Sequence, residues 1–244
     1  MIPNIFLAFS LALSMPLSAA ADVSPEDPVQ TQADTPERAE TLPGQNRFAW
    51  TPVDGDVIRF KVLRKGSPFG THIIRFSGDA ATELNVRSQV ELKAGLGPIT
   101  LFKYALDARE TWIDGVLVEL EGTGNNDGKK MRVSAQQNGE TLSITGTEFT
   151  GEVPLGILPS SHWNMAQIDT SQMVSTEDGE IIPVASQKVG REEVMIEGQS
   201  ILADRYLLVS AINLDLWYDD QARLVKLAFE TQGQSIVYQL QNLY

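Results

Sequence analysis

Nucleophile-and-base chemistry in this sequence depends on two histidines, His72 and His162, because the chain contains no cysteine. His162 follows Ser160 and Ser161, and a serine close to a histidine is the pairing that nucleophilic catalysis uses. A catalytic triad, however, is built from residues that meet in space and needs an orienting acid that a single sequence does not locate. We therefore favour a structural role, in which a serine caps a short helix and His162 packs, and rank a hydrolase using His162 below it.

Metal ligands and paired carboxylates indicate no further site. The two histidines lack zinc-ligand spacing, and Asn125, Asn126 and Asp127 lack the later bidentate glutamate of a calcium loop. Asp219 and Asp220 are adjacent acids, but at a predicted hairpin tip we expect them to be solvated turn residues. The signatures of common esterases, metalloproteases and phosphate-binding loops are absent. We expect neither a metal nor a cofactor, and favour a protein without catalytic activity.

Aromatic side chains supply the candidate binding residues. Core packing is their default role, because aromatic rings carry much apolar area into a sheet core. The alternative is that some of them line an apolar cavity inside a curled sheet. The candidate ligand-binding residues are Phe102, Tyr104, Trp112, Trp163, Trp217 and Tyr218.

The elements that must position these residues are strands. After Arg47, apolar and polar residues alternate, and turn signals recur mostly every 10 to 14 residues, which is typical of an antiparallel meander. The strands at 206–211 and 225–229 are apolar on both faces, so a second layer or a ligand must cover them. One short helix is predicted within 159–168. We predict a mainly β fold, an antiparallel meander curled into a half-barrel or barrel with one short helix.

The first 46 residues differ in composition from the rest. Residues 1–21 have a short apolar core, a proline and then three alanines, which is the order of elements in a secretory signal peptide cut between Ala21 and Asp22. Residues 22–46 hold six acids, one base and four prolines, which is typical of a disordered leader. We therefore expect a periplasmic protein with a single β-rich domain over residues 47–244, and no membrane span after signal cleavage.

The charge balance excludes one class of partner. The chain has 19 basic and 32 acidic residues, a formal net charge of −13. Nucleic-acid binding relies on basic groups that neutralise phosphates, so we expect no nucleic-acid partner.

Five stretches of the chain carry a family resemblance, namely Phe60–His72, Leu96–Tyr104, Glu110–Gly115, Leu158–Asn164 and Asp215–Leu227. They resemble a bacterial family of exported proteins known as domain of unknown function 6134. The resemblance covers most of the chain after Arg47, and it implies a single sheet-dominated periplasmic domain with no established activity. One departure is Ala222, where the family hairpin tends to carry glycine; if this position needs a positive φ, alanine costs about 1 kcal/mol there.

Together these patterns predict a binding function rather than catalysis. We expect an exported protein that holds an apolar small molecule, a lipid or a peptide against the curled sheet. The alternative is a cell-envelope scaffold whose apolar surface contacts another envelope protein, with the His162 hydrolase ranked third.

Overall fold

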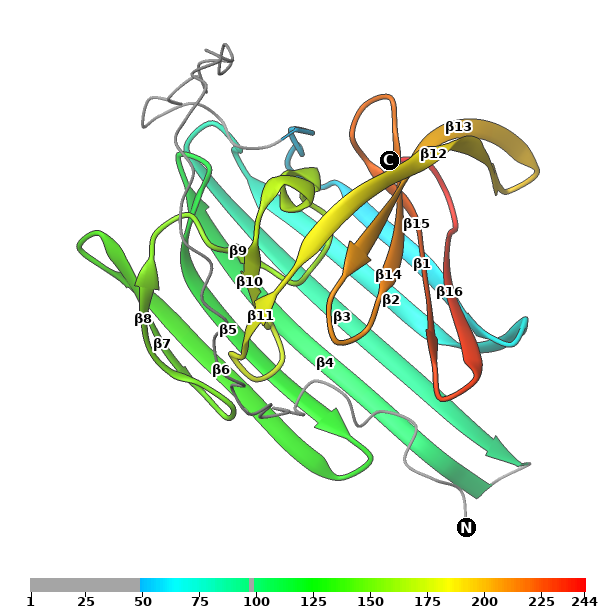
Figure 1. Cartoon of the computed structure of the whole chain (residues 1–244), viewed down its shortest axis with the longest axis horizontal. Helices are drawn as coiled ribbons and strands as arrows, with labels where there is room; N and C mark the ends of the chain where they lie inside the picture. Colours follow the sequence, from blue (N-terminus) through cyan, green and yellow to red (C-terminus); the bar gives the residue numbers. More distant parts are fainter. Residues whose placement is uncertain (1–48, 97–98) are drawn as a thin grey trace, which may run out of the picture.

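The chain after its first 48 residues folds into long antiparallel strands (Figure 1). The structure is a computed structural model that describes residues 49–96 and 99–244. The predicted signal peptide at 1–21 and leader at 22–46 lie outside the described residues.

Thirteen strands of the described chain form one sheet in the order β12-β13-β14-β15-β16-β1-β2-β3-β4-β5-β6-β7-β8. Nearly all neighbours in this order are consecutive strands joined by tight turns, which confirms the predicted antiparallel meander. The strands are β1 (Val57–Arg64), β2 (Ser67–Gly78), β3 (Glu83–Leu96), β4 (Ile99–Ile113), β5 (Val116–Asn126), β6 (Lys129–Asn138), β7 (Thr141–Gly146), β8 (Thr150–Pro154), β12 (Ala185–Ile196), β13 (Gln199–Val209), β14 (Leu214–Asp219), β15 (Leu224–Thr231) and β16 (Gln234–Leu240).

The predicted curling into a half-barrel or barrel is wrong. The sheet is open, with β8 and β12 as its two edges, and it is not strongly curled. The first strand, β1, pairs with the last strand, β16, so these two strands lie side by side within the sheet. Closure would require pairing of β8 with β12, but the residues between these strands leave the meander and form a separate small sheet.

This small sheet belongs to a segment that we call the covering segment, residues 158–183. It contains β9 (Leu158–Pro159), β10 (Gln172–Val174) and β11 (Ile181–Pro183), in the order β11-β10-β9. In Figure 1 these strands lie in front of the large sheet. They form a second layer over part of the large sheet, where the segment lies against Gly122 of β5 and Gly146 of β7. Of the strands predicted to need cover on both faces, β13 leaves Val209 exposed.

The predicted helix within 159–168 is present only as a 3₁₀ turn, η1 (Met165–Asp169), and the described residues contain no α-helix. Its cap is Asn164, whose side chain accepts a hydrogen bond from the Ala166 backbone N–H at 3.0 Å, and not a serine. A five-residue turn is too short to offset the cost of nucleating an α-helix.

Alternation within the strands is confirmed where the sequence showed it. In β1, buried Phe60 and Val62 alternate along the strand with exposed Arg59 and Lys61. In β4, Phe102 is buried next to exposed Lys103. One face of the sheet is therefore apolar and the other solvated, as expected for an antiparallel sheet covered on one side.

Two glycines in the sheet allow the covering segment to lie directly on the strands. A Cβ atom on Gly122 of β5 would be 2.0 Å from the Thr176 carbonyl oxygen, and one on Gly146 of β7 would be 2.2 Å from that of Asp178. Gly122 lies inside β5, and its lack of a side chain lets the backbone of the covering segment approach the backbone of β5 closely.

The main core joins the two layers. Trp163 of the covering segment is fully buried and packs edge-on against Trp112 of β4 and Phe76 of β2, with ring centroids 5.6 and 5.2 Å apart. Across the described residues, no helix is long and apolar enough to cross a membrane.

Candidate functional site

A cavity of about 260 Å³ lies where the covering segment meets the large sheet. The floor of the cavity is formed by two rows of residues that strand pairing places side by side across the sheet. Every residue in these rows except Gly124 lines the cavity. The first row contains His72, Val90, Leu106, Gly124 and Met131. The second row contains Leu92, Tyr104, Asn126 and Lys129.

The other walls come from two more parts of the chain. The covering segment contributes Ser160, Ser161, His162 and the run Ser175–Asp178. Apolar side chains of the C-terminal strands and of the turn before them complete the enclosure; they are Ile212, Leu214, Leu227, Phe229 and Tyr238.

The cavity brings together both histidines of the chain. His72 is 8% exposed, its Nε2 lies 2.8 Å from the Ser88 Oγ, and its ring packs edge-on against Tyr238. Burial and, to a smaller extent, the nearby His162 lower the pKa of His72 to about 3. His72 is therefore neutral at physiological pH and a weak base, whereas an effective general base has a pKa near the working pH.

His162 is held in an unusual backbone conformation. Its φ of 63° lies in the left-handed region, where residues other than glycine are uncommon. Its carbonyl oxygen accepts hydrogen bonds from the Tyr218 hydroxyl at 2.9 Å and the Gln167 amide at 3.1 Å. Its ring Nδ1 lies 2.7 Å from the Gln167 Oε1, so the partner of the imidazole is an amide and not the carboxylate that orients the base of a triad.

Burial also lowers the pKa of His162, although the hydrogen bond with Gln167 opposes this shift. Both imidazoles of the cavity are consequently uncharged near neutral pH.

The serines beside His162 hold the covering segment in place. The Ser160 Oγ accepts a hydrogen bond from the Thr176 backbone N–H at 3.1 Å, which joins the two parts of the segment that line the cavity. Ser161 is buried and hydrogen-bonds the carboxyl group of Glu110. These contacts give both serines a structural role.

Glu110 is a buried carboxyl group beneath the covering segment. Its Oε2 accepts hydrogen bonds from the indole N–H groups of Trp112 at 2.9 Å and Trp163 at 3.1 Å. Burial raises the pKa of Glu110, and the hydrogen bonds from Ser161 and the two tryptophans partly offset this. Glu110 thus links β4 to the covering segment through polar contacts inside an apolar core.

Glu177 places a carboxyl group on the cavity wall, which Glu110 does not reach. It hydrogen-bonds the Tyr104 hydroxyl and lies against Gly124, where a Cβ atom would be 2.8 Å from the Glu177 Cγ. Burial and the neighbouring Asp178 raise the pKa of Glu177, Tyr104 and Lys129 oppose the shift, and the net pKa is about 7. Near neutral pH this group is partly protonated.

Of the six predicted ligand-binding residues, the structure places Tyr104 on the cavity wall. Phe102 packs in a smaller core cluster, where its ring stacks on Phe69 at 5.9 Å. Trp112 and Trp163 lie in the main core and bind Glu110.

Trp217 and Tyr218 also lie outside the cavity lining. The Trp217 indole donates a hydrogen bond to the Glu192 Oε1 at 2.6 Å, and the Lys226 ammonium lies 3.9 Å from the centre of its ring. Tyr218 is fully buried and supports the cavity indirectly, through its hydrogen bond to the His162 carbonyl.

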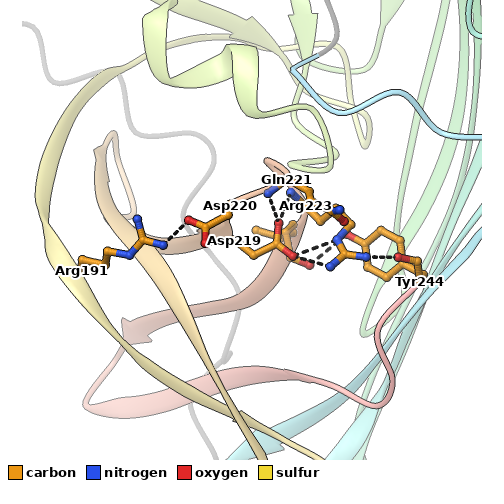
Figure 2. A network of polar contacts seen from close by, with 7 residues as sticks. Arg191, Asp219, Asp220, Gln221, Arg223 and Tyr244 are labelled. Atoms are coloured by element: carbon orange, nitrogen blue, oxygen red, sulfur yellow. Dashed lines mark hydrogen bonds and ion pairs between the residues drawn. The ribbon is translucent and has the colours of Figure 1, made fainter.

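Asp219 and Asp220, the adjacent acids of the β14–β15 hairpin, are both paired (Figure 2). The Asp219 side chain is 8% exposed and accepts hydrogen bonds from the backbone N–H groups of Gln221 and Arg223 and from the Arg223 guanidinium. Asp220, which is largely exposed, pairs with Arg191 of β12. The expectation of two solvated turn residues is therefore wrong for Asp219, whose carboxylate closes the turn.

Sequence reasoning missed Ser88 and Glu177. Ser88 had a detectable signal, because it interrupts the apolar face of β3 between Val86 and Val90. Glu177 had none, since its position depends on how the covering segment folds back onto β5.

The open antiparallel sheet and the covering segment define a mainly β protein with a partly enclosed cavity between them. The chain belongs to the family Domain of unknown function (DUF6134), whose model matches residues 60–241 and confirms the resemblance. A crystal structure of a beta-barrel-like protein of domain of unknown function DUF1849 from Brucella abortus is similar in fold, with a TM-score of 0.52 and 8% identity, over 78% of this chain and 97% of that chain. A search of the curated proteins finds no significant match.

Proposed function

We propose that this protein binds a small, largely apolar ligand in the cavity between the covering segment and the sheet. The observation that carries the proposal is the cavity itself, about 260 Å³ in volume, in which apolar side chains of the sheet face a polar wall from the covering segment. Ligand sites combine apolar walls with placed polar groups and have volumes of ~300 to ~1,000 Å³, so this cavity is slightly smaller than most. The volume suits a small molecule or one end of a longer one.

Catalysis is the weaker alternative. The only two histidines of the chain are both neutral, His72 is a weak base, and the His162 ring is bonded to an amide. A non-catalytic carrier needs neither a base nor a nucleophile, so it accounts for the same geometry more simply.

We also propose that the protein acts in the periplasm. This proposal rests on the signal-peptide pattern of residues 1–21.

Native mass spectrometry of the protein purified from the periplasm tests the binding function. We expect an adduct of small mass that is lost on denaturation. The variant Val90→Phe fills part of the cavity and should lose the adduct, whereas Val209→Phe adds the same bulk at an exposed position and should keep it. Circular dichroism checks that both variants fold. A protein that carries no adduct and binds none of a panel of small apolar molecules would overturn the proposal.

An envelope scaffold is the second candidate, and one observation favours it. The β12–β13 hairpin exposes four large apolar side chains, which can contact a partner protein. They are Val189, Met195, Leu202 and Val209. Crosslinking in intact cells separates the two functions, because a scaffold should yield one dominant protein partner and a ligand carrier should not.

A further inference from the structure

Two carboxyl groups and one lysine are the side chains of the described cavity lining that carry charge outside the two neutral histidines. Glu177 and Asp178 are consecutive residues of the covering segment, and both line the cavity. Of the basic side chains among the described lining residues, both histidines are neutral and Lys129 lies with its Nζ 3.2 Å from the Glu148 Oε1. The positive charge of Lys129 is thus already paired with a carboxylate that does not line the cavity.

Glu177 is the carboxyl group that a ligand would meet. Its side chain is only partly buried, lies against Gly124 and is fixed by the Tyr104 hydroxyl. The titratable groups that act on it are Asp178, Tyr104, Lys129 and Tyr238.

Electrostatics at Glu177 favour a positively charged ligand group. Burial and the neighbouring Asp178 carboxylate disfavour ionisation of Glu177. A cation within ~4–6 Å of Glu177 would offset both effects. A ligand carboxylate at the same place would face the carboxyl groups of Glu177 and Asp178. Repulsion between these like charges would lower the affinity for such a ligand.

The rest of the cavity suits an organic cation. Among the residues that the structure describes, there is no group of three or more histidine, cysteine, aspartate or glutamate side chains that could hold a metal ion. The remaining walls are largely apolar, and aromatic rings such as those of Tyr104 and Tyr238 also attract cations. We infer that the cavity selects a small apolar amine, whose ammonium group pairs with Glu177; this inference rests on the proposed ligand-binding function.

Three probes of the same shape test this inference, namely hexylamine, 1-hexanol and hexanoate. Isothermal titration calorimetry at pH 8, where Glu177 is mostly ionised, measures their affinities for the full mature protein. We expect hexylamine to bind at least about tenfold more tightly than 1-hexanol, and hexanoate to bind more weakly than 1-hexanol. Between pH 8 and pH 6 the affinity for hexylamine should fall about tenfold as Glu177 is protonated, while that for 1-hexanol should stay constant.

The variant Glu177→Gln should remove both the preference for the amine and its pH dependence, while 1-hexanol still binds. The matched control is Glu91→Gln, which removes the same charge at an exposed position of β3 and should keep the preference. Equal binding of amine and alcohol by the unmodified protein, or an amine preference that survives Glu177→Gln, would overturn the inference and leave ligand binding intact. Failure of all three probes to bind would overturn the proposed function itself.

Discussion

Ala222 occupies a backbone conformation that favours glycine. Ala222 lies in the turn between β14 and β15 and has a φ of 61°. This position therefore has the positive φ for which the family hairpin tends to carry glycine. A residue with a Cβ atom pays about 1–2 kcal/mol in the left-handed region, and glycine loses ~0.4–1 kcal/mol more chain entropy on folding. We predict that Ala222→Gly raises the free energy of unfolding by up to about 1 kcal/mol, measured by urea denaturation.

Ala81 provides the control, because it lies in another exposed turn and is not among the residues with positive φ. Ala81→Gly should lower stability by up to ~1 kcal/mol, since only the entropy cost remains. A loss of stability in both variants would show that the left-handed backbone at Ala222 carries no strain.

His72 makes stability sensitive to acid. Its pKa is about 3 in the folded protein and 6.5 in an unfolded chain, so between these values the unfolded state binds more protons. The contribution of His72 to the free energy of unfolding is therefore complete above pH 6.5. It is lost as the pH falls below 6.5, by roughly 1 kcal/mol for each pH unit. We predict that His72→Gln, which stays neutral, shows a smaller loss of unfolding free energy than the unmodified protein between pH 6.5 and pH 5.

Urea denaturation at a series of pH values measures this difference. Glu177 and His162 titrate in both proteins, so they contribute to both slopes and largely cancel in the comparison. Parallel pH profiles for the two proteins would mean that His72 is protonated as easily in the folded state as in the unfolded one.

At the scale of elements, contact between the covering segment and β5 depends on Gly122. A Cβ atom there would lie 2.0 Å from the Thr176 carbonyl oxygen and 2.8 Å from the Val133 side chain, far inside normal contact distance. We predict that Gly122→Ala displaces the run Ser175–Asp178 and costs about 1–3 kcal/mol, as overpacking does. Urea denaturation measures the loss of stability, and hydrogen exchange should be faster in this run.

Gly190 of β12 is the matched control, since a Cβ atom there has no neighbour within 4 Å and its φ is not positive. Gly190→Ala should leave both stability and exchange in the covering segment unchanged or slightly improved. Equal exchange rates in the Gly122→Ala and Gly190→Ala proteins would contradict the proposed close packing.

The elements themselves were largely predictable, because period-two alternation and turn residues are local properties of the chain. The hairpin of β14 and β15 and the alternation in β1 and β4 are such cases. The covering segment was not predictable, since its path depends on contacts between distant residues. Gly122 carried a partial signal, because a glycine inside a strand often marks close approach of another backbone.

The site was predicted less well for the same reason. The sequence showed His72 and His162 as the candidate bases, but they are 90 positions apart, and only the register of β2 and the position of the covering segment bring both to one cavity. The aromatic residues were visible as large apolar groups, yet which of them face a cavity is decided by packing, and of the six candidates Tyr104 lies on its wall.

At the scale of the whole molecule, an open sheet exposes two edge strands. β12 is one of them, and its outward side chains include Lys188, Arg191, Glu192 and Glu193. Charged side chains on an edge strand disfavour pairing with a second chain. The β12 edge is therefore a poorer template for pairing with a second chain than an uncharged edge of the same length would be.

The remaining prediction concerns processing of the whole chain. Signal peptidases require small residues at the first and third positions of the A-x-A site, here Ala19 and Ala21, and tolerate a larger residue between them. We predict that the periplasmic protein begins at Asp22, which intact-mass and N-terminal sequencing measure. Ala21→Phe should block cleavage and leave the precursor in the membrane fraction, whereas Ala20→Phe adds the same side chain at the tolerant position and should be processed normally. A protein that begins at Met1 and remains in the cytoplasm would contradict export and, with it, the proposed periplasmic function.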